Sequence, residues 1–321
     1  MIRIDPHKAA KVAPEYWRLL KLFLKGNRKK SKLEKYATKA KGYRRQLAYV
    51  DKGLVDSSTI ALGNPDDIKK DYAAHFKKGR NLDKFSNLME GYYNRFLGTT
   101  IKDLDSNHPD KELKVRTWLA KELGVKTCPY CNREYTFSRK LRSGREAHPE
   151  FDHFYPKSKY PFLALSLYNL VPSCHSCNHR KSKDEIDLNP YYKSFEDDGL
   201  RFTLVDKVTG GRGVTKVDDH WVFDPSKVEV KITNSNENVS VLGLEEVYSG
   251  HTDVVADIVT KAQAYNDSFY QSLVDSYSGL GKTPAEIYRL IWGTYMNPQE
   301  YGLRPLSKFT KDVLDELGIK R

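Results

Sequence analysis

The sequence predicts an α+β fold, and three observations lead to that prediction. Apolar residues recur at helical spacing within the first 123 residues and again after residue 250. Short strand-like runs, separated by Gly, Asn and Asp, occupy residues 199–244. A third segment, rich in Cys, His, Pro and Tyr, follows neither pattern. The regions we expect are a basic, helical N-terminal region at 1–123, a compact core at 124–190, and a β-rich segment with C-terminal helices packing on the core at 191–321.

Composition favours a soluble protein of the cytoplasm. Of the 321 residues, 39% are hydrophobic, which is enough to bury a core, and 30% are charged. No apolar run approaches the roughly 18 residues that a membrane span needs. The N-terminus shows neither an apolar signal segment nor a small-residue cleavage site. We therefore expect a cytoplasmic protein with no membrane partner, in which the four cysteines bind metal rather than form disulfides.

The positive charge is concentrated at one end of the chain. The formal net charge is +12, and residues 1–45 alone hold fifteen Lys or Arg against three acids. The remaining residues carry 39 charges of each sign and sum to zero. Such an arm attracts a polyanion, so we expect it to contact nucleic acid or an acidic partner surface. A solvated helix face with a flexible loop is the alternative. The densest part of the arm holds Arg28, Lys29 and Lys30.

Helix signals occupy both ends of the chain. Pro14 is expected to open a helix whose apolar residues recur over residues 16–24. Three further helices are expected within residues 66–123, each followed by a Gly stop signal. After residue 252 the helical period returns, and Thr283 with Glu286 has the spacing of a capping box.

Strand signals lie between these helical regions. The runs REYTFSRK and REAHPEFDHF flank LRSG and predict a hairpin. Four later runs, LRFTLV, HWVFD, VEVKI and VSVLGL, are also predicted to be strands.

Two paired CxxC motifs use every cysteine in the chain. They are Cys128-Pro-Tyr-Cys131 and Cys174-His-Ser-Cys177. Four thiolates make the closed tetrahedral set of a structural zinc site, so we expect Zn²⁺ here in a structural rather than a catalytic role. The competing interpretations are a redox dithiol, which needs only one motif, and an iron–sulfur cluster.

The residues between and after these motifs follow a distinctive order. The first CxxC is followed by Asp152-His153, then by Asn169-Leu170, then by the second CxxC, which runs directly into Asn178 and, three residues later, Lys181. This order resembles the HNH endonucleases, a zinc-framed branch of the ββα-metal nucleases. The resemblance covers roughly residues 128–185. It implies a ββα-metal core within the α+β fold and the hydrolysis of phosphodiester bonds.

Phosphodiester hydrolysis needs an activated water and a cation that neutralises developing charge. His153 is the candidate general base, because the pKa of an imidazole lies close to working pH. Asp152 is expected to bind Mg²⁺ or Mn²⁺ from the other face of the strand. The resemblance implies that Asn178 is the second protein ligand of this cation. It also implies that Asn169 orients the histidine or fixes the loop, and we count it as a catalytic-site residue.

Register distinguishes the remaining polar residues of the second CxxC. The family places its third ligand directly after the second cysteine, which makes Asn178 the ligand and leaves His175 and His179 without a catalytic role. Lys181 and Arg180 are expected to meet phosphate at the start of the helix. For Arg180 the alternative is a solvated helix face.

A narrower resemblance covers the run from FDHFYPKSKYP to CHSCNHRKS, the earlier CPYCNREY and the C-terminal RPLSKFTKDVLDELG. It is similar to the HNH subunits of Septu-type anti-phage systems, some of them retron-associated. This implies an ABC/SMC-like ATPase as a partner that controls the nuclease, with a retron reverse transcriptase and its nucleic acid as further expected partners. From the ordered set of Asp152, His153, Asn169 and Asn178 we expect DNA as the substrate. The alternatives are an RNA nuclease, with tRNA as an example of its substrate, and a non-catalytic, zinc-stabilised nucleic-acid-binding or adaptor module.

Overall fold

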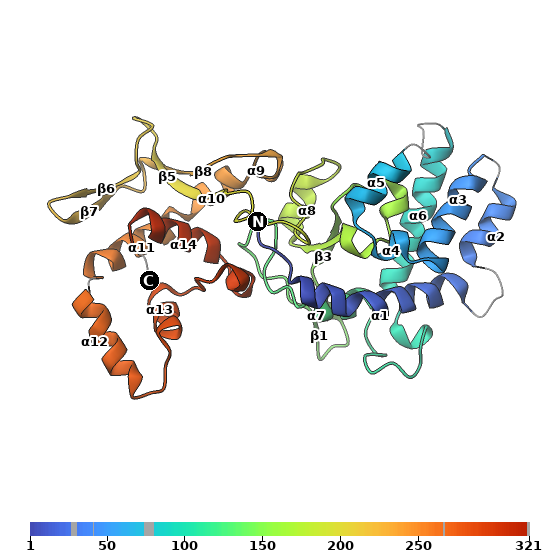
Figure 1. Cartoon of the computed structure of the whole chain (residues 1–321), viewed down its shortest axis with the longest axis horizontal. Coiled ribbons are helices and arrows are strands. Elements are labelled where there is room, and N and C mark those ends of the chain that lie inside the picture. The colour runs from blue at the N-terminus through green and yellow to red at the C-terminus, as the bar shows by residue number, and fades with distance from the viewer. Residues whose placement is uncertain (27–30, 41, 74–79, 266, 320–321) are drawn as a thin grey trace. The chain divides into compact units, whose positions relative to one another are not determined.

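The structure, a computed structural model, describes residues 1–26, 31–40, 42–73, 80–265 and 267–319. Helices and small antiparallel sheets make up these residues, so the predicted α+β class is confirmed (Figure 1). Contacts divide the chain into two compact units. The N-terminal unit comprises Ile4–Val125 and Thr136–Glu185, and the C-terminal unit comprises Met1–Arg3, Lys126–Tyr135 and Ile186–Arg321. The domain boundaries predicted from the sequence stay a prediction.

The N-terminal unit is mainly helical. Its helices are α1 (Pro6–Lys25), α2 (Lys32–Lys39), α3 (Arg44–Asp51), α4 (Thr59–Leu62), α5 (Pro65–Ala73), α6 (Arg80–Gly98), α7 (Val115–Leu123) and α8 (His175–Lys181). Its strands are β1 (Arg139–Lys140), β2 (Glu146–Ala147), β3 (Glu150–His153) and β4 (Leu170–Ser173). Within the described residues, no helix is long and apolar enough to cross a membrane.

The prediction that Pro14 opens the first helix is wrong. Helix α1 begins at Pro6, and the Asp5 carboxylate caps it by accepting hydrogen bonds from the amides of His7 (2.9 Å) and Lys8 (3.4 Å). Asp followed by Pro supplies both a cap and a first residue with preset φ, which is a strong helix start. Pro14 therefore lies inside the helix.

Aromatic side chains of α1 and α6 form the core of this unit. Tyr16 meets Phe96 edge to face with ring centroids 5.6 Å apart, and Phe23 lies 5.4 Å from the same ring. The buried Tyr16 hydroxyl also donates to the carbonyl oxygen of Leu165 at 3.0 Å. Because Leu165 belongs to the loop between β3 and β4, this hydrogen bond ties the predicted catalytic segment to the helical core.

Strands β3 and β4 and helix α8 make a ββα element. The strands pair antiparallel, with Asp152 opposite Val171 and His153 opposite Leu170, and α8 packs on β3 (Figure 1). On the β4 side of this strand pair, all four residues are buried. Asp152 and His153 are therefore fixed on a strand rather than on a mobile loop.

The C-terminal unit combines two small sheets with helices. Its strands are β5 (Phe202–Asp206), β6 (Val214–Val217), β7 (His220–Phe223) and β8 (Val228–Ile232), paired as β5–β8 and β6–β7. Its helices are α9 (Glu237–Leu242), α10 (Leu244–Tyr248), α11 (Thr252–Ala264), α12 (Asp267–Ser278), α13 (Pro284–Trp292) and α14 (Ser307–Glu316). The predicted capping box of Thr283 and Glu286 is present at the start of α13.

The run VSVLGL is helical, so its prediction as a strand is wrong. The Asn236 side chain caps α9 by accepting from the amides of Asn238 and Val239, and Gly243 ends the helix with φ of 55°. These start and stop signals outweigh the strand preference of the two valines, and Val239 and Leu242, three residues apart, form the buried face of the short helix.

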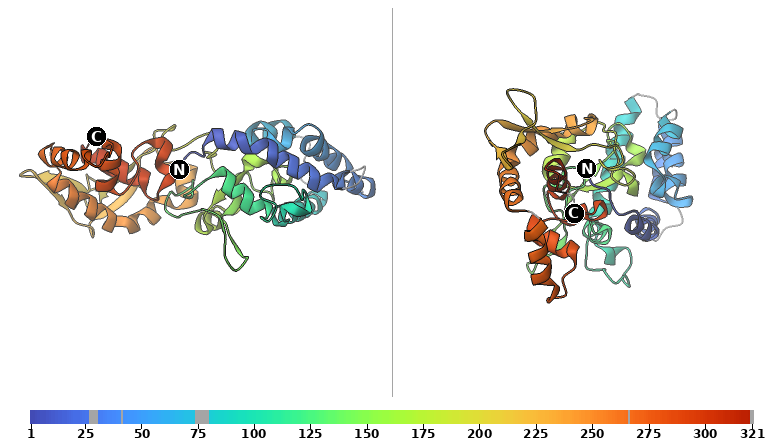
Figure 2. Two further views of the ribbon diagram at one scale, coloured as in Figure 1. Left: turned by 90° about the horizontal axis from the view of Figure 1, so that it is seen from below. Right: turned by 60° about the vertical axis from the view of Figure 1, so that its left-hand side comes forward.

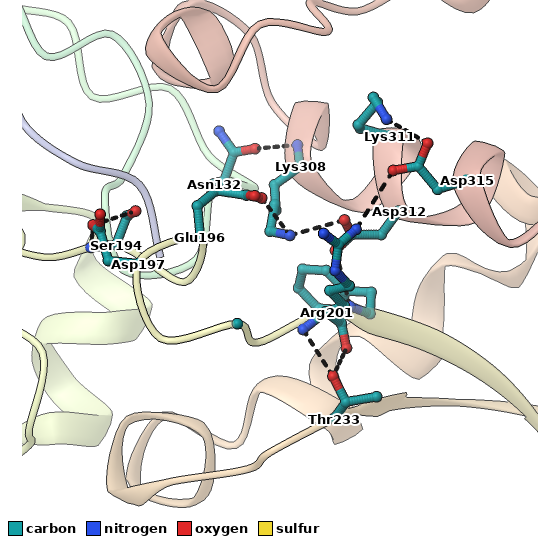
Figure 3. Close-up of polar contacts among 12 residues, drawn as sticks. Asn132, Ser194, Glu196, Asp197, Arg201, Thr233, Lys308, Lys311, Asp312 and Asp315 are labelled. Carbon is teal, nitrogen blue, oxygen red and sulfur yellow. Dashed lines mark hydrogen bonds and ion pairs between the residues drawn. The ribbon is translucent and has the colours of Figure 1, made fainter. Parts of the chain in front are cut away.

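Asn132, directly after the first CxxC motif, anchors that motif within the C-terminal unit. Its amide nitrogen donates to the Thr127 hydroxyl (2.9 Å) and to the carbonyl oxygens of Tyr301 (3.0 Å) and Arg304 (3.2 Å). Its amide oxygen accepts from the backbone of Lys308, which begins the buried network in Figure 3.

The Lys308 ammonium completes this network. It lies 2.6 Å from Glu196 and 2.8 Å from Asp312 (Figure 3). Two carboxylates compensate the one buried cation, as burial of a charge requires.

Candidate active site

Strand β3 presents two chemically different faces. Side chains alternate along a strand, so Glu150 and Asp152 share one face while His153 lies on the other. Both Asp152 and His153 are buried, with 3% and 6% of their surfaces exposed. Strand β3 therefore carries a buried carboxylate and a buried imidazole on adjacent residues.

Lys181 of α8 lies against the Asp152 carboxylate. Its ammonium is 3.2 Å from the Asp152 carboxylate and donates to the backbone carbonyl of His153 at 2.8 Å. The side chain is entirely buried. The prediction that Lys181 meets phosphate is therefore not met in this structure, because three residues after Asn178 the helix turns this side chain toward β3 rather than toward solvent.

Asn178 also points toward β3, where it meets Glu150. The Asn178 amide nitrogen donates to one Glu150 oxygen at 2.6 Å, and the other oxygen lies 2.9 Å from Nδ1 of His175. Burial alone raises the pKa of Glu150, but these hydrogen bonds from Asn178 and His175 outweigh burial and hold the pKa below its usual value. Glu150 is thus a carboxylate that orients Asn178.

The ring of His153 is held on two sides. Its Nε2 lies 3.1 Å from the carbonyl oxygen of Ala164, and its ring meets that of Tyr93 on α6, with centroids 4.5 Å apart. Burial lowers the pKa of His153 to about 3, and the Lys157 and Lys181 charges add to the effect, while the Ala164 hydrogen bond opposes it. The imidazole is accordingly neutral at physiological pH. Because a carbonyl oxygen can only accept, Nε2 carries the proton and Nδ1 carries the lone pair.

Asn169 holds the loop between β3 and β4. Its amide oxygen accepts from the backbone amide of Tyr155 at 2.8 Å. Its amide nitrogen donates to the carbonyl oxygens of Tyr155 (3.1 Å) and Leu163 (3.2 Å). All the hydrogen-bonding groups of this fully buried side chain serve the backbone of the loop. Of the two roles implied for Asn169, this geometry favours fixing the loop.

Asp152, His153 and Asn178 line one cleft of about 740 Å³. Glu150 and Tyr93 line it too, and Lys157 and Lys183 contribute positive charge. A carboxylate and an amide oxygen are ligands that Mg²⁺ and Mn²⁺ prefer, so Asp152 and Asn178 fit a hard cation. Asn169 is not among the residues that line this cleft.

The four cysteines lie together. The sulfur atoms of Cys128, Cys131, Cys174 and Cys177 are all within 4.8 Å of one another, and all four residues are buried. Tetrahedral zinc with Zn–S bonds of about 2.3 Å requires sulfur atoms about 3.8 Å apart. The donor set and its compactness therefore fit a metal ion bound by four thiolates. The backbone amide of Arg133 also donates to the Cys131 sulfur at 3.4 Å.

The other predicted nucleic-acid contacts have different outcomes. Arg28, Lys29 and Lys30 lie outside the described residues. Arg180 is exposed on α8, and its contact with phosphate stays a prediction.

Sequence reasoning missed Glu150 and Tyr93. Glu150 had a usable signal, because it lies two residues before Asp152 and so shares its face of the strand. Tyr93 had none, since only the packing of α6 on the ββα element brings its ring to His153. Its hydroxyl donates to the Phe151 carbonyl at 3.2 Å, and burial raises the pKa of Tyr93, so it remains a neutral donor.

Comparison with known proteins agrees with this geometry. The family model for HNH endonucleases matches residues 128–184, the segment that holds the four cysteines, β3, β4 and α8. This segment of the chain is therefore of the HNH type. More particularly, the chain is similar to the Septu protein PtuB of Bacillus thuringiensis, with 32% identity over 102 residues, which cover 30% of this chain and 37% of that protein. No solved structure matches this chain at a significant level.

Proposed function

We propose that this protein is a metal-dependent endonuclease that hydrolyses phosphodiester bonds in DNA. The observation that carries the proposal is the convergence of Asp152, His153 and Asn178 on one cleft, within the segment that matches the HNH endonucleases. Hydrolysis of a phosphodiester requires a group that accepts a proton from water and ligands that hold a cation, and a neutral imidazole beside a pair of oxygen donors supplies both.

His153 acts as the general base through Nδ1. Donation from Nε2 to the Ala164 carbonyl fixes the tautomer, and contact with the Tyr93 ring fixes the plane of the imidazole. Burial keeps the ring neutral, so Nδ1 offers a lone pair to a water proton, but the same burial lowers the pKa and makes this imidazole a weaker base than the sequence-based expectation of a pKa close to working pH. Asn169 contributes indirectly, because it holds the Leu163 carbonyl, next to Ala164 in the loop between β3 and β4.

Asp152 and Asn178 hold the catalytic cation, Mg²⁺ or Mn²⁺. Such a cation neutralises charge on the phosphate and the leaving oxygen. Asn178 donates its amide nitrogen to Glu150, which directs the amide oxygen away from Glu150 and makes it available as a ligand. Lys181 pairs with Asp152 and balances its buried charge when the cation is absent.

The four cysteines hold Zn²⁺ in a structural role. A zinc ion with four thiolate ligands has no open position, so it binds no substrate or water. The cluster supports the proposal by placing Cys174, which caps α8, and with it the helix that carries Asn178 and Lys181.

A plasmid-nicking assay tests the proposed function. Wild-type protein is expected to convert supercoiled plasmid to open circles with Mg²⁺ or Mn²⁺ and to stop when EDTA is added. His153→Ala is expected to lose this activity while remaining folded and retaining its zinc content. Undiminished cleavage by His153→Ala would remove the assignment of the base. Cleavage of RNA but not of DNA would favour the RNA nuclease. Normal binding without any cleavage, both alone and with an ATPase recovered from the host, would favour the non-catalytic module.

The relative named as a Septu protein supports a role in a defence system. We propose that the protein is the cytoplasmic nuclease subunit of an anti-phage system and that an ABC/SMC-like ATPase controls it. Purification of the tagged protein from its host, followed by mass spectrometry, should recover such an ATPase, with or without a retron reverse transcriptase. A protein inactive alone but active with the recovered ATPase would support this regulation, whereas full activity alone that the ATPase does not change would contradict it.

A further inference from the structure

The hairpin formed by β1 and β2 projects from the N-terminal unit and is strongly basic. Figure 2 shows it in green extending into solvent in the left view. Every residue from 139 to 145 is exposed, and Leu141 at the turn keeps 45% of its surface accessible. The exposed cations are Arg139, Lys140, Arg142 and Arg145.

The charge of this hairpin is not neutralised locally. Among the described residues, no ion pair joins Arg139, Arg142 or Arg145 to a carboxylate. Glu146 is the one acid within the hairpin strands, and it accepts hydrogen bonds from the Thr117 hydroxyl and the Lys114 amide instead. The hairpin therefore presents several positive charges to solvent.

The base of the hairpin is fixed although its turn is exposed. Glu146 anchors β2 to the start of α7 through Lys114 and Thr117, and the Ser138 hydroxyl donates to the Thr117 carbonyl at 3.2 Å. The turn is closed by donation from the Leu141 amide to the Arg145 carbonyl (2.7 Å), with Gly144 at φ of 79°. These contacts give the cations a defined direction.

The hairpin leads directly into the catalytic strand. Asp152 follows Glu146, at the base of the hairpin, by six residues, and it follows Arg142, at the turn, by ten residues. These paths are at most about 22 Å and about 36 Å, and the longer one corresponds to about ten base pairs of duplex at 3.4 Å each. His148 and Pro149, between the hairpin and β3, line the cleft. A duplex that places one phosphate in the cleft can therefore reach the hairpin with phosphates that lie within one helical turn of the first.

We propose that the β1–β2 hairpin is a DNA-binding arm that contacts backbone phosphates within about one helical turn, roughly ten base pairs, of the cleaved bond. The proposal rests on the proposed nuclease function for its choice of polyanion. Arginine side chains on an exposed ribbon bind phosphate without reading sequence, so the arm contributes affinity and position rather than specificity.

The test compares a triple variant, Arg139→Gln with Arg142→Gln and Arg145→Gln, with wild-type protein. Binding to a fluorescent duplex of about three helical turns is measured by anisotropy without divalent metal, so that cleavage does not interfere. If each arginine contacts one phosphate, the slope of log affinity against log salt should fall by about 2.7 in magnitude. The expected loss of affinity at about 0.15 M salt is at least tenfold.

Two further variants make the outcome specific. Lys207→Gln with Lys216→Gln and Lys227→Gln removes the same charge from exposed positions of the C-terminal unit and should change affinity less than twofold. Replacing the three hairpin arginines by lysine keeps their positive charge, so this variant should retain most of the wild-type salt dependence.

The proposal is overturned if the hairpin variant binds DNA with wild-type affinity and salt slope, or if the charge-matched control loses as much. A hairpin variant that keeps DNA binding but loses a protein partner would identify the arm as a protein-binding surface and would also overturn it. Wild-type protein that neither binds nor cleaves DNA would contradict the proposed function itself, which separates the two failures.

Discussion

The proposed cation site predicts that the Glu150→Ala substitution weakens metal binding. The substitution removes the carboxylate that accepts from Asn178 at 2.6 Å, so the Asn178 amide loses the contact that orients it. Residues that orient a metal ligand typically change metal affinity by 10- to 100-fold. We therefore expect Mn²⁺ to bind Glu150→Ala about 10- to 100-fold more weakly, which is about 1.4–2.7 kcal/mol.

Isothermal titration with Mn²⁺, on protein that retains its zinc, measures this change without any need for catalysis. The matched control is His175→Ala, which removes the other hydrogen-bond partner of Glu150 from a side chain that is 78% exposed. It leaves the contact between Glu150 and Asn178 intact and should change Mn²⁺ affinity less than threefold. If Asp152→Ala abolishes Mn²⁺ binding while Glu150→Ala leaves it unchanged, the orienting role of Glu150 is refuted.

Three further predictions concern stability. Lys181→Met leaves the buried Asp152 carboxylate uncompensated and should lower the free energy of unfolding, measured by urea titration, by about 3–5 kcal/mol. Lys183→Met, at an exposed position, should change it by less than about 0.5 kcal/mol. Equal effects of the two substitutions would contradict the pairing of Lys181 with Asp152. Asn169→Ala strips three backbone groups of their partners and should cost about 3 kcal/mol or more; a thermal shift indistinguishable from wild type would show that the loop does not depend on it. Because the folded pKa of His153 lies below that of an unfolded histidine, the unfolded state binds the extra proton, and stability falls as pH decreases below about 6.5. Between about pH 6.5 and 5.5, without added Mg²⁺, wild-type protein should lose about 1 kcal/mol more than His153→Gln, and parallel pH dependences would contradict the neutral, buried imidazole.

The sequence predicted the parts of the site that depend on local order. Two CxxC motifs that use every cysteine indicated one cluster of four, and the cysteines do lie together. Alternation along a strand separated Asp152 from His153, and the ββα order placed Asn178 on the following helix. These inferences need only neighbouring residues and strand or helix periodicity.

What the sequence could not provide depends on packing. Lys181 looks like a surface cation in a basic run, and only the approach of α8 to β3 buries its ammonium against Asp152. Tyr93 reaches His153 from an α-helix sixty residues upstream. The two local errors had competing signals: Asp5 and Pro6 start α1 before Pro14, and Asn236 and Gly243 make a helix of a run that looks like a strand.

The central claim is that the protein holds two different metal centres, a closed structural zinc and an open catalytic cation. Anomalous diffraction from crystals grown with Mn²⁺ tests it directly, with data collected on both sides of the zinc and manganese absorption edges. The predicted result is a zinc peak among Cys128, Cys131, Cys174 and Cys177, and a separate manganese peak bound by Asp152 and Asn178. Manganese absent from that position, or bound only by other residues, would contradict the proposed catalytic centre.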